Sequence, residues 1–147
     1  MTLREATSRD ALLLHELMRA FNAEHEFHWH EEMGAAMDRL LQDPSLGLAW
    51  LIESEDQNIG YIVICFGFSL EFRGRDAFVD ELYVRPAFRG RGFGRAALVR
   101  VADEARKHGV RALHLEVARG TPALLRLYES LGYEERPHPF RTLVLDP

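Results

Sequence analysis

The chain has 147 residues, of which 47% are hydrophobic and 28% charged, and its formal net charge is −5. This size suits one domain around a single core, so we expect residues 1–147 to form one domain. The acidic balance disfavours nucleic acid as a main partner, and no apolar run is long enough to cross a bilayer. One cysteine, Cys65, excludes an internal disulfide, and with no apolar leader at the start it favours a cytoplasmic protein.

The first half of the chain is predicted to contain a short strand, two helices and two further strands. Apolar residues recur at helical spacing between Leu13 and Phe21, and the second helix should end before Pro44. In order, the elements are a strand at 2–6, a helix capped by Thr7 or Ser8, a helix at Glu31–Leu41, and strands at 46–54 and 59–70 joined by the turn EDQN.

The second half is predicted to alternate between strands and helices, without an internal repeat. In order, the elements are a strand at 77–84, an amphipathic helix at Gly92–His108 closed by Gly109, a strand at 112–118, a helix at Thr121–Leu131 followed by Gly132, and short strands around Tyr133 and at Thr142–Leu145. The whole pattern is typical of a mixed α/β domain.

The strongest motif is the run AFVDELYVRPAFRGRGFGRAALVRVADEARK, residues 77–107, in which a strand ends in a loop that opens a helix. Three glycines and three arginines fall within the loop and first turn: Gly90, Gly92, Gly94, Arg89, Arg91 and Arg95. The glycines let the backbone approach a ligand, and the helix directs unsatisfied N–H groups and its positive end there. Because the guanidinium groups suit diphosphate oxygens, the motif predicts a cradle for a phosphorylated carrier.

Other phosphate and nucleic-acid motifs fit this loop poorly. No GK followed by Ser or Thr occurs, which excludes a Walker loop. The dinucleotide pattern GxGxxG with an acid about 20 residues further on is also unmet. RGFG at 91–94 matches the opening of an RNA-binding signature, but Arg95 stands where an aromatic residue is required.

The remaining pattern, Arg-x-x-Gly-x-Gly preceded by DELYVRP, resembles the GCN5-related N-acetyltransferase superfamily. A second stretch, LHLEVARGTPALLRLYESLGYEE at 113–135, is similar to the family's next strand, its helix and the LYxxLGF-like signature. The resemblance implies the GNAT (acyl-CoA N-acyltransferase) fold. In that fold a mixed central sheet of about six to seven strands, splayed between strands 4 and 5, is flanked by about four helices.

The resemblance also implies acetyl-CoA as co-substrate and identifies the residues that would hold it. The pantetheine arm would bond the backbone along the strand before the loop, and the diphosphate would lie on the loop. A helix that the family commonly opens with Asn opens here with Thr, so that cofactor contact is expected to differ. The implied cofactor-binding residues are Leu82, Tyr83, Val84, Arg89, Gly90, Arg91, Gly92, Phe93, Gly94, Arg95 and Thr121.

By the same resemblance, Tyr128 would protonate the sulfur of coenzyme A, the alternative being a buried core tyrosine. Asp80 and Glu81 are adjacent on a strand, so in an ideal strand they point to opposite faces. The resemblance makes Asp80 the base, acting directly or through water, and Glu81 a neighbour that holds a cationic substrate if a bulge turns it inward. The alternatives are an ion pair to Arg73, Arg75 or Arg85, and water as the base.

The acidic and aromatic segment EHEFHWHEE, residues 24–32, falls between the first two helices, where the family often has the lip of its acceptor site. The candidate substrate-binding residues are Glu24, His25, Phe27, Trp29, Glu71 and Phe72. The three histidines of the segment do not keep one helical spacing, so we expect no metal.

The expected activity is transfer of acetyl from acetyl-CoA to a primary amine of a small polyamine- or amino-acid-like acceptor. Because Cys65 lies within the apolar run YIVICFGF, we expect it to be buried, and we expect direct attack in a ternary complex rather than an acyl-enzyme. The alternatives are a protein or peptide N-acetyltransferase and a non-catalytic acyl-CoA-binding module. Neither nucleic acid nor membrane is an expected partner, and a homodimer remains open.

Overall fold

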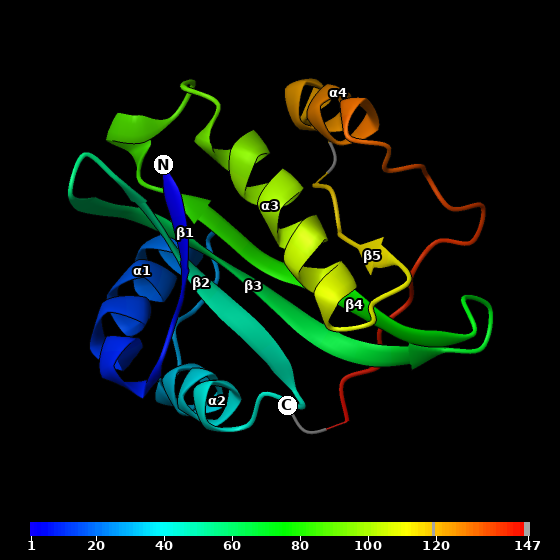
Figure 1. The fold of residues 1–147 in the computed structure, drawn as a ribbon, viewed down its shortest axis with the longest axis horizontal. Helices are drawn as coiled ribbons and strands as arrows, with labels where there is room; N and C mark the ends of the chain where they lie inside the picture. The colour runs from blue at the N-terminus through cyan, green and yellow to red at the C-terminus, as the bar shows by residue number, and fades with distance from the viewer. Residues whose placement is uncertain (119, 146–147) are drawn as a thin grey trace. The chain divides into compact units, whose positions relative to one another are not determined.

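The computed structural model describes residues 1–118 and 120–145, drawn in Figure 1. The chain divides into two compact units, Met1–Glu116 and Val117–Pro147. The first unit contains the sheet and three of the α-helices, and the second contains the remaining one.

The sheet of the first unit has five strands in the order β1-β2-β3-β4-β5. The first four strands pair antiparallel with their neighbours, and β5 pairs parallel with β4, which confirms the predicted mixed sheet. The strands are β1 (Thr2–Glu5), β2 (Gly47–Ser54), β3 (Gln57–Ser69), β4 (Gly74–Val84) and β5 (Leu113–His114).

Four α-helices are present in the described part of the chain, in agreement with the expected number: α1 (Ala11–Glu24), α2 (Glu31–Gln42), α3 (Phe93–Lys107) and α4 (Pro122–Ser130). Short 3₁₀ turns at Ser8–Asp10 and Pro86–Phe88 lead into α1 and into the loop before α3. Thr7 caps the first turn as predicted, because its hydroxyl accepts the Arg9 N–H at 3.3 Å. Within the described ranges, no helix combines the length and the apolar character needed to span a membrane.

Both faces of the sheet are covered by helices, because β2 and β3 contain continuous buried apolar runs whose successive side chains point to opposite faces. One face packs against α1 and α2, with Leu14, Leu17 and Met37 meeting Leu51 and Tyr61. The other face receives α3, whose Ala97 is fully buried in a cluster with Ile52 and Ile59. Figure 1 shows α3 crossing its face of the sheet, away from α1 and α2.

The pairing between β4 and β5 is short. It joins Ala77 to Leu113 and Phe78 to His114, and β4 then continues to Val84 paired only with β3. The two strands therefore separate beyond Phe78, at the place where the resemblance implies a splay, and the backbone on that edge of β4 becomes accessible to a ligand.

The predicted strand count is wrong for the described residues, which contain five strands instead of about six to seven. The strand expected at 112–118 is reduced to Leu113–His114, and those expected around Tyr133 and at Thr142–Leu145 are absent from the described part of 133–145. Pro137 and Pro139 interrupt that segment and lack the N–H that a sheet ladder requires. The prediction of strands here relied on apolar residues and gave too little weight to these prolines.

Candidate active site

The loop that joins β4 to α3 has the backbone that the glycine pattern predicts. Gly90 and Gly92 have φ values of 73° and 81°, in the left-handed region that favours glycine, and Gly92 is the residue that caps α3. Gly94 lies within the first turn of α3, and a Cβ atom built at any of the three glycines meets nothing within 4 Å. The outer side of the loop is therefore open, and the first amides of α3 point toward it without an intrahelical acceptor.

Arg89 is held firmly at the base of this loop. Its Nε donates to the Val84 carbonyl oxygen at 2.7 Å, and its Nη2 lies 2.8 and 2.7 Å from the two carboxylate oxygens of Glu24 at the end of α1. The guanidinium carbon also lies 5.4 Å from the centre of the Tyr83 ring. A diphosphate that used Arg89 would have to share it with Glu24.

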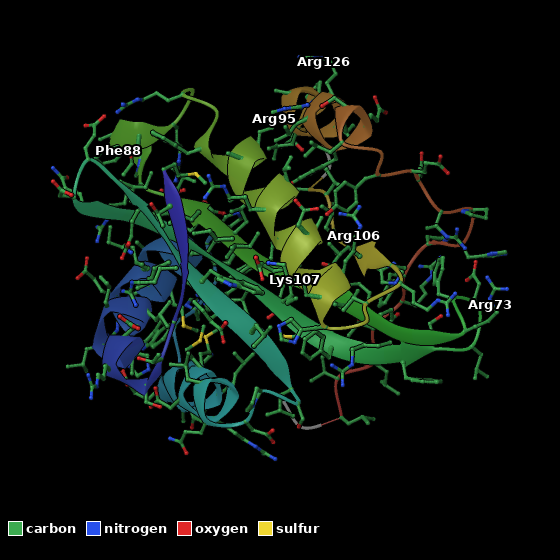
Figure 2. All side chains as sticks on the ribbon, viewed as in Figure 1. Arg73, Phe88, Arg95, Arg106, Lys107 and Arg126 are labelled. Carbon is green, nitrogen blue, oxygen red and sulfur yellow. The ribbon has the colours of Figure 1, made fainter. Side chains whose placement is uncertain are left out.

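Arg91 and Arg95 follow Arg89 in the loop and in the first turn of α3. Arg91 donates to Glu55 of the β2–β3 turn at 2.5 Å, and its guanidinium stacks 5.0 Å from the Phe93 ring. Figure 2 labels Arg95 on the first turn of α3. Arg89 and Arg91 are thus already paired with carboxylates, so the backbone amides are a more available part of the cradle than these two guanidinium groups.

A β-bulge interrupts β4 at the acid pair. Val63 pairs with Glu81 whereas the next residue, Ile64, pairs with Val79, so Asp80 is the extra residue of β4. An extra residue breaks the alternation of side chains and brings two neighbours to one face. The prediction that both acids cannot enter one site holds only for an ideal strand, and the bulge removes that restriction.

Two side chains of β3 contact the two acids directly. The Tyr61 hydroxyl donates to Glu81 Oε2 at 2.7 Å, and the Cys65 thiol donates to the Asp80 carboxylate. Tyr61 is fully buried, whereas Asp80 remains open to solvent. Because Tyr61 and Cys65 both lie on the α1/α2 side of β3, the two carboxylates share that side of the sheet.

The alternative of an ion pair to a nearby arginine is not supported. Among the ion pairs of the described residues, Arg85 pairs with Glu16 at 2.9 Å and none joins Asp80 or Glu81 to a guanidinium. Arg75 stacks 4.5 Å from the Phe66 ring. The acid pair therefore keeps its charge available for a ligand.

Surrounding protein atoms remove part of the water around both carboxylates, although Asp80 still meets solvent, and this raises the pKa of Asp80 and of Glu81 above the ordinary range. The hydrogen bonds from Cys65 and Tyr61 partly offset this, while the repulsion from Asp80 raises the pKa of Glu81 further. Burial, followed by the charges of the two acids, raises the pKa of the Cys65 thiol to about 11. The carboxyls thus accept protons more readily than free ones, and the thiol stays protonated at neutral pH.

Cys65 is half-buried, which corrects the expectation of a buried core residue. Its apolar neighbours in sequence suggested the core, but the side chain lies at the border of the helix-covered face, next to Asp80. Sequence reasoning also missed the role of Tyr61 as a hydrogen-bond donor to an acid. Only the register of β3 against β4, including the bulge, reveals either contact.

The segment that follows α1 lies near the acid pair. His25 caps α1, its Nδ1 lies 2.8 Å from the Phe21 carbonyl oxygen, and its ring stacks 5.8 Å from Phe27. The charge of His25 lowers the pKa of Glu81, as expected for a neighbour. Trp29 donates from Nε1 to Glu31 at 3.0 Å.

The two other predicted lip residues lie at the opposite end of β4. Glu71 and Phe72 belong to the β3–β4 turn, and the Phe72 ring lies 5.6 Å from His114. In Figure 2, Arg73 marks this turn and Phe88 marks the other end of the hairpin. The start of β4 at Gly74 lies seven residues from Glu81, about 23 Å at strand spacing, so the backbone of this turn is well separated from the acid pair, and a role of Glu71 and Phe72 in the acceptor site stays a prediction.

The histidines of that segment do not form a metal cluster. Across the described ranges, no three His, Cys, Asp or Glu side chains converge as they would around an ion.

Tyr128 belongs to the second unit. It lies on α4, half-buried, with its ring 6.0 Å from Tyr133, and burial raises the pKa of its hydroxyl. Thr121 occupies the N-cap position of α4, but its hydroxyl donates to the Ala118 carbonyl oxygen at 2.6 Å. The prediction that its side chain caps the helix is therefore wrong.

Comparison with known proteins identifies the family. Residues 14–133 match the model of the Acetyltransferase (GNAT) family, and the chain belongs to this family.

The chain is 31% identical over 77 residues to the thialysine N-epsilon-acetyltransferase of Bos taurus, covering 52% of this chain and 45% of that protein. It is 42% identical over 60 residues to the [ribosomal protein bS18]-alanine N-acetyltransferase of Escherichia coli K12, covering 41% and 40%. The matches thus span less than half the length of these curated relatives. The crystal structure of an integron cassette protein from the Cole Harbour salt marsh metagenome superposes with a TM-score of 0.88, at 36% identity over 99% of this chain and 91% of that one.

Proposed function

We propose that the chain is an acetyl-CoA-dependent N-acetyltransferase that acts on a primary amine of a small, polyamine- or amino-acid-like acceptor. The observation that carries the proposal is that β4 combines both halves of such a site. Its bulge brings two carboxylates to one face, and the strand runs directly into an amide-rich loop at the start of α3. The strand would thus hold the cationic acceptor, and the loop that follows it would hold the diphosphate of the cofactor.

The loop from Arg89 to Arg95 would hold the diphosphate of coenzyme A. Open space at Gly90, Gly92 and Gly94 supports a close approach of phosphate oxygens to the backbone. The edge of β4 beyond Phe78, with the backbone of Leu82, Tyr83 and Val84, would bind the pantetheine arm, because β5 no longer pairs there. Acetyl-CoA supplies a thioester carbonyl that an amine can attack. The site requires no metal in this proposal.

The acid pair would prepare the acceptor. An amine is protonated at neutral pH and must lose a proton before it can attack a carbonyl. Asp80, open to solvent and with a raised pKa, is suited to accept that proton directly or through water. Glu81, beside it, would hold the ammonium group before the transfer, and Glu24, His25, Phe27 and Trp29 would border the acceptor.

Tyr128 would return a proton to the sulfur of the departing thiolate. This role rests on the match of LLRLYESLGY to the family signature, and a phenol that keeps its proton at neutral pH is a suitable donor. Direct attack by the amine is favoured over an acyl-enzyme because the Cys65 thiol stays protonated near neutral pH.

Two relatives support an amine acceptor without separating small molecules from proteins. One is named for the ε-amine of thialysine and the other for an alanine of a ribosomal protein. The acidic pair favours a cationic small molecule, because a carboxylate that is not neutralised by a guanidinium attracts a free ammonium group. A protein or peptide acceptor is the alternative.

A panel of amines with acetyl-CoA tests the proposal, with release of free thiol as the measurement. The panel should contain diamines, polyamines, basic amino acids and peptides with free N-termini. Turnover of the small cations above that of the peptides supports the proposal, and a preference for peptides would replace it with the protein acceptor. Tight binding of acetyl-CoA with no turnover of any amine would indicate a non-catalytic binding module.

A further inference from the structure

Tyr61 is the most deeply buried polar contact of the acid pair, and the mechanism above does not use it. Its side chain is fully enclosed in the core between the sheet and the two N-terminal helices, yet its hydroxyl reaches Glu81 at 2.7 Å. A phenol O–H bonded to a carboxylate is a strong, charge-assisted contact. A core position that needs only an aromatic ring is satisfied by Phe, so the hydroxyl has no packing purpose.

The two carboxylates of the bulge have unequal donors. Glu81 accepts from the phenol of Tyr61, whereas Asp80 accepts from the thiol of Cys65, which is a weak donor. The stronger donor fixes the orientation of its carboxylate and favours its ionised form. Asp80 is left less restrained and is the acid that remains open to solvent.

Charged and titratable groups face this pair from three elements. From β3 they are Tyr61 and Cys65, and from β4 each acid faces the other. From the end of α1, His25 acts on Glu81 and lowers its pKa. A second tyrosine of β4, Tyr83, has its ring 6.2 Å from that of Tyr61 and interacts instead with Glu24. Of the two neighbouring tyrosines, Tyr61 is thus the one that donates a hydrogen bond to Glu81.

We propose that Tyr61 is a positioning residue for acetyl transfer: its hydroxyl holds Glu81 in place as the anion that receives the acceptor's ammonium group, and this leaves Asp80 to accept the proton. The inference rests on the proposed function and deepens it by dividing the roles of the two acids. The ammonium group loses one proton to Asp80, the C–N bond forms and the C–S bond breaks. After the attack the nitrogen loses a second proton, and the departing thiolate gains one proton, so the protons balance.

Tyr61→Phe tests the assignment because it removes one oxygen and keeps the ring. We expect the KM of the acceptor to rise about tenfold, with a smaller change in kcat, since a hydrogen bond to a charged group is lost. The acid limb of kcat/KM should move to higher pH, because Glu81 loses a donor that favours its charged form. On a Glu81→Gln background the same substitution should leave the KM of the acceptor unchanged, which separates the contact from general damage to the core.

Cys65→Ser provides a second variant whose effect has the opposite sign. A serine hydroxyl is a stronger donor to Asp80 than a thiol, so the acid limb should move to lower pH while the KM of the acceptor changes little. This variant tests the complementary role of Asp80. If Tyr61→Phe fails to fold, which circular dichroism and coenzyme A binding would reveal, an unchanged acid limb for Cys65→Ser would overturn the division of roles between the two acids. Equal acceptor KM and equal pH profiles for wild type and folded Tyr61→Phe would overturn the inference.

Failure of the proposed function gives a different result. If no amine is acetylated, that function is wrong, whereas the contact itself can still be followed by isotope-edited infrared spectroscopy of the glutamate carboxylates. Tyr61→Phe should then raise the pH at which Glu81 titrates, and an unchanged titration would overturn the positioning role independently of activity.

Discussion

The loop after β4 and the acid pair within β4 adjoin in sequence but are built in opposite ways. The loop depends on local chemistry, since two left-handed glycines and the start of a helix create its amide-lined surface. The acid pair depends on contacts with another strand, because a bulge and two donors from β3 decide where each carboxylate lies. A local site tolerates changes elsewhere in the core, whereas a cross-strand site is sensitive to them.

The largest expected effect is the loss of kcat when an acid of the pair in β4 is replaced. Asp80→Asn should lower kcat by about 10²- to 10⁴-fold, the usual contribution of a positioned base. The loss should shrink as pH rises toward the pKa of the acceptor amine, because the free amine then no longer needs a base. Rates over a pH series with one good acceptor measure this.

Asp103→Asn is the control for that substitution, since Asp103 forms an exposed pair with Arg106 on α3. It removes the same charge at a place where only a small effect is expected. A rate for Asp80→Asn within threefold of the control at neutral pH would show that Asp80 does not act as the base.

A smaller loss is expected in the second unit. Tyr128→Phe should lower kcat by about 10²-fold, because it removes the donor proposed for the thiolate. Tyr133→Phe is the matched control, since that ring lies 6.0 Å from Tyr128 on the same unit. Stopped-time assays of free thiol measure both variants. Equal rates for the two variants at every pH would remove Tyr128 from the mechanism.

The smallest effects are on stability, and they have opposite signs for two aspartates. The pKa of Asp80 is raised in the folded protein, so its ionisation opposes folding and stability falls as pH rises through that pKa. The pKa of Asp10 is lowered, by its hydrogen bonds from Arg4 first, so its contribution exists above the unfolded pKa and is lost as pH falls through the folded one.

Denaturant unfolding at pH 7 and pH 3 separates the two aspartates. Asp80→Asn should be more stable than wild type at pH 7 and lose that advantage at pH 3. Asp10→Asn should be less stable by about 1 kcal/mol at pH 7, with a smaller difference at pH 3. If both substitutions changed the free energy of unfolding in the same direction at pH 7, the contrast between the two aspartates would be wrong.

The difference between the two regions also explains what the sequence could predict. The helix expected at Gly92–His108 is found at Phe93–Lys107, and the loop before it has the unusual backbone that its glycines permit, because both features depend on local sequence. The pairing of Glu81 with Tyr61 depends on a one-residue shift of register that no propensity encodes.

Two further differences between the sequence predictions and the structure concern which segments meet in space. The strands expected after α4 were predicted from apolar residues such as Leu143 and Val144, but the nearby Pro137 and Pro139 lack the N–H that a sheet ladder requires. Glu71 and Phe72 were predicted to border the acceptor from their place before β4, and the sequence could not show that their turn starts seven residues from Glu81 along that strand. Sequence thus predicts local backbone structure better than it predicts which side chains meet across strands.

The central claim, that the loop after β4 grips the diphosphate of coenzyme A, is tested most directly by calorimetry of coenzyme A with Gly94→Asp and Gly94→Asn. A Cβ atom at position 94 meets nothing within 4 Å, and an acid in the first turn of a helix is favourable, so the Asp variant should fold at least as stably as the Asn variant. We predict that Asp binds coenzyme A about tenfold or more weakly than Asn at low salt, with a gap that narrows as salt is added. Equal affinities of the two variants would place the diphosphate elsewhere and contradict the account.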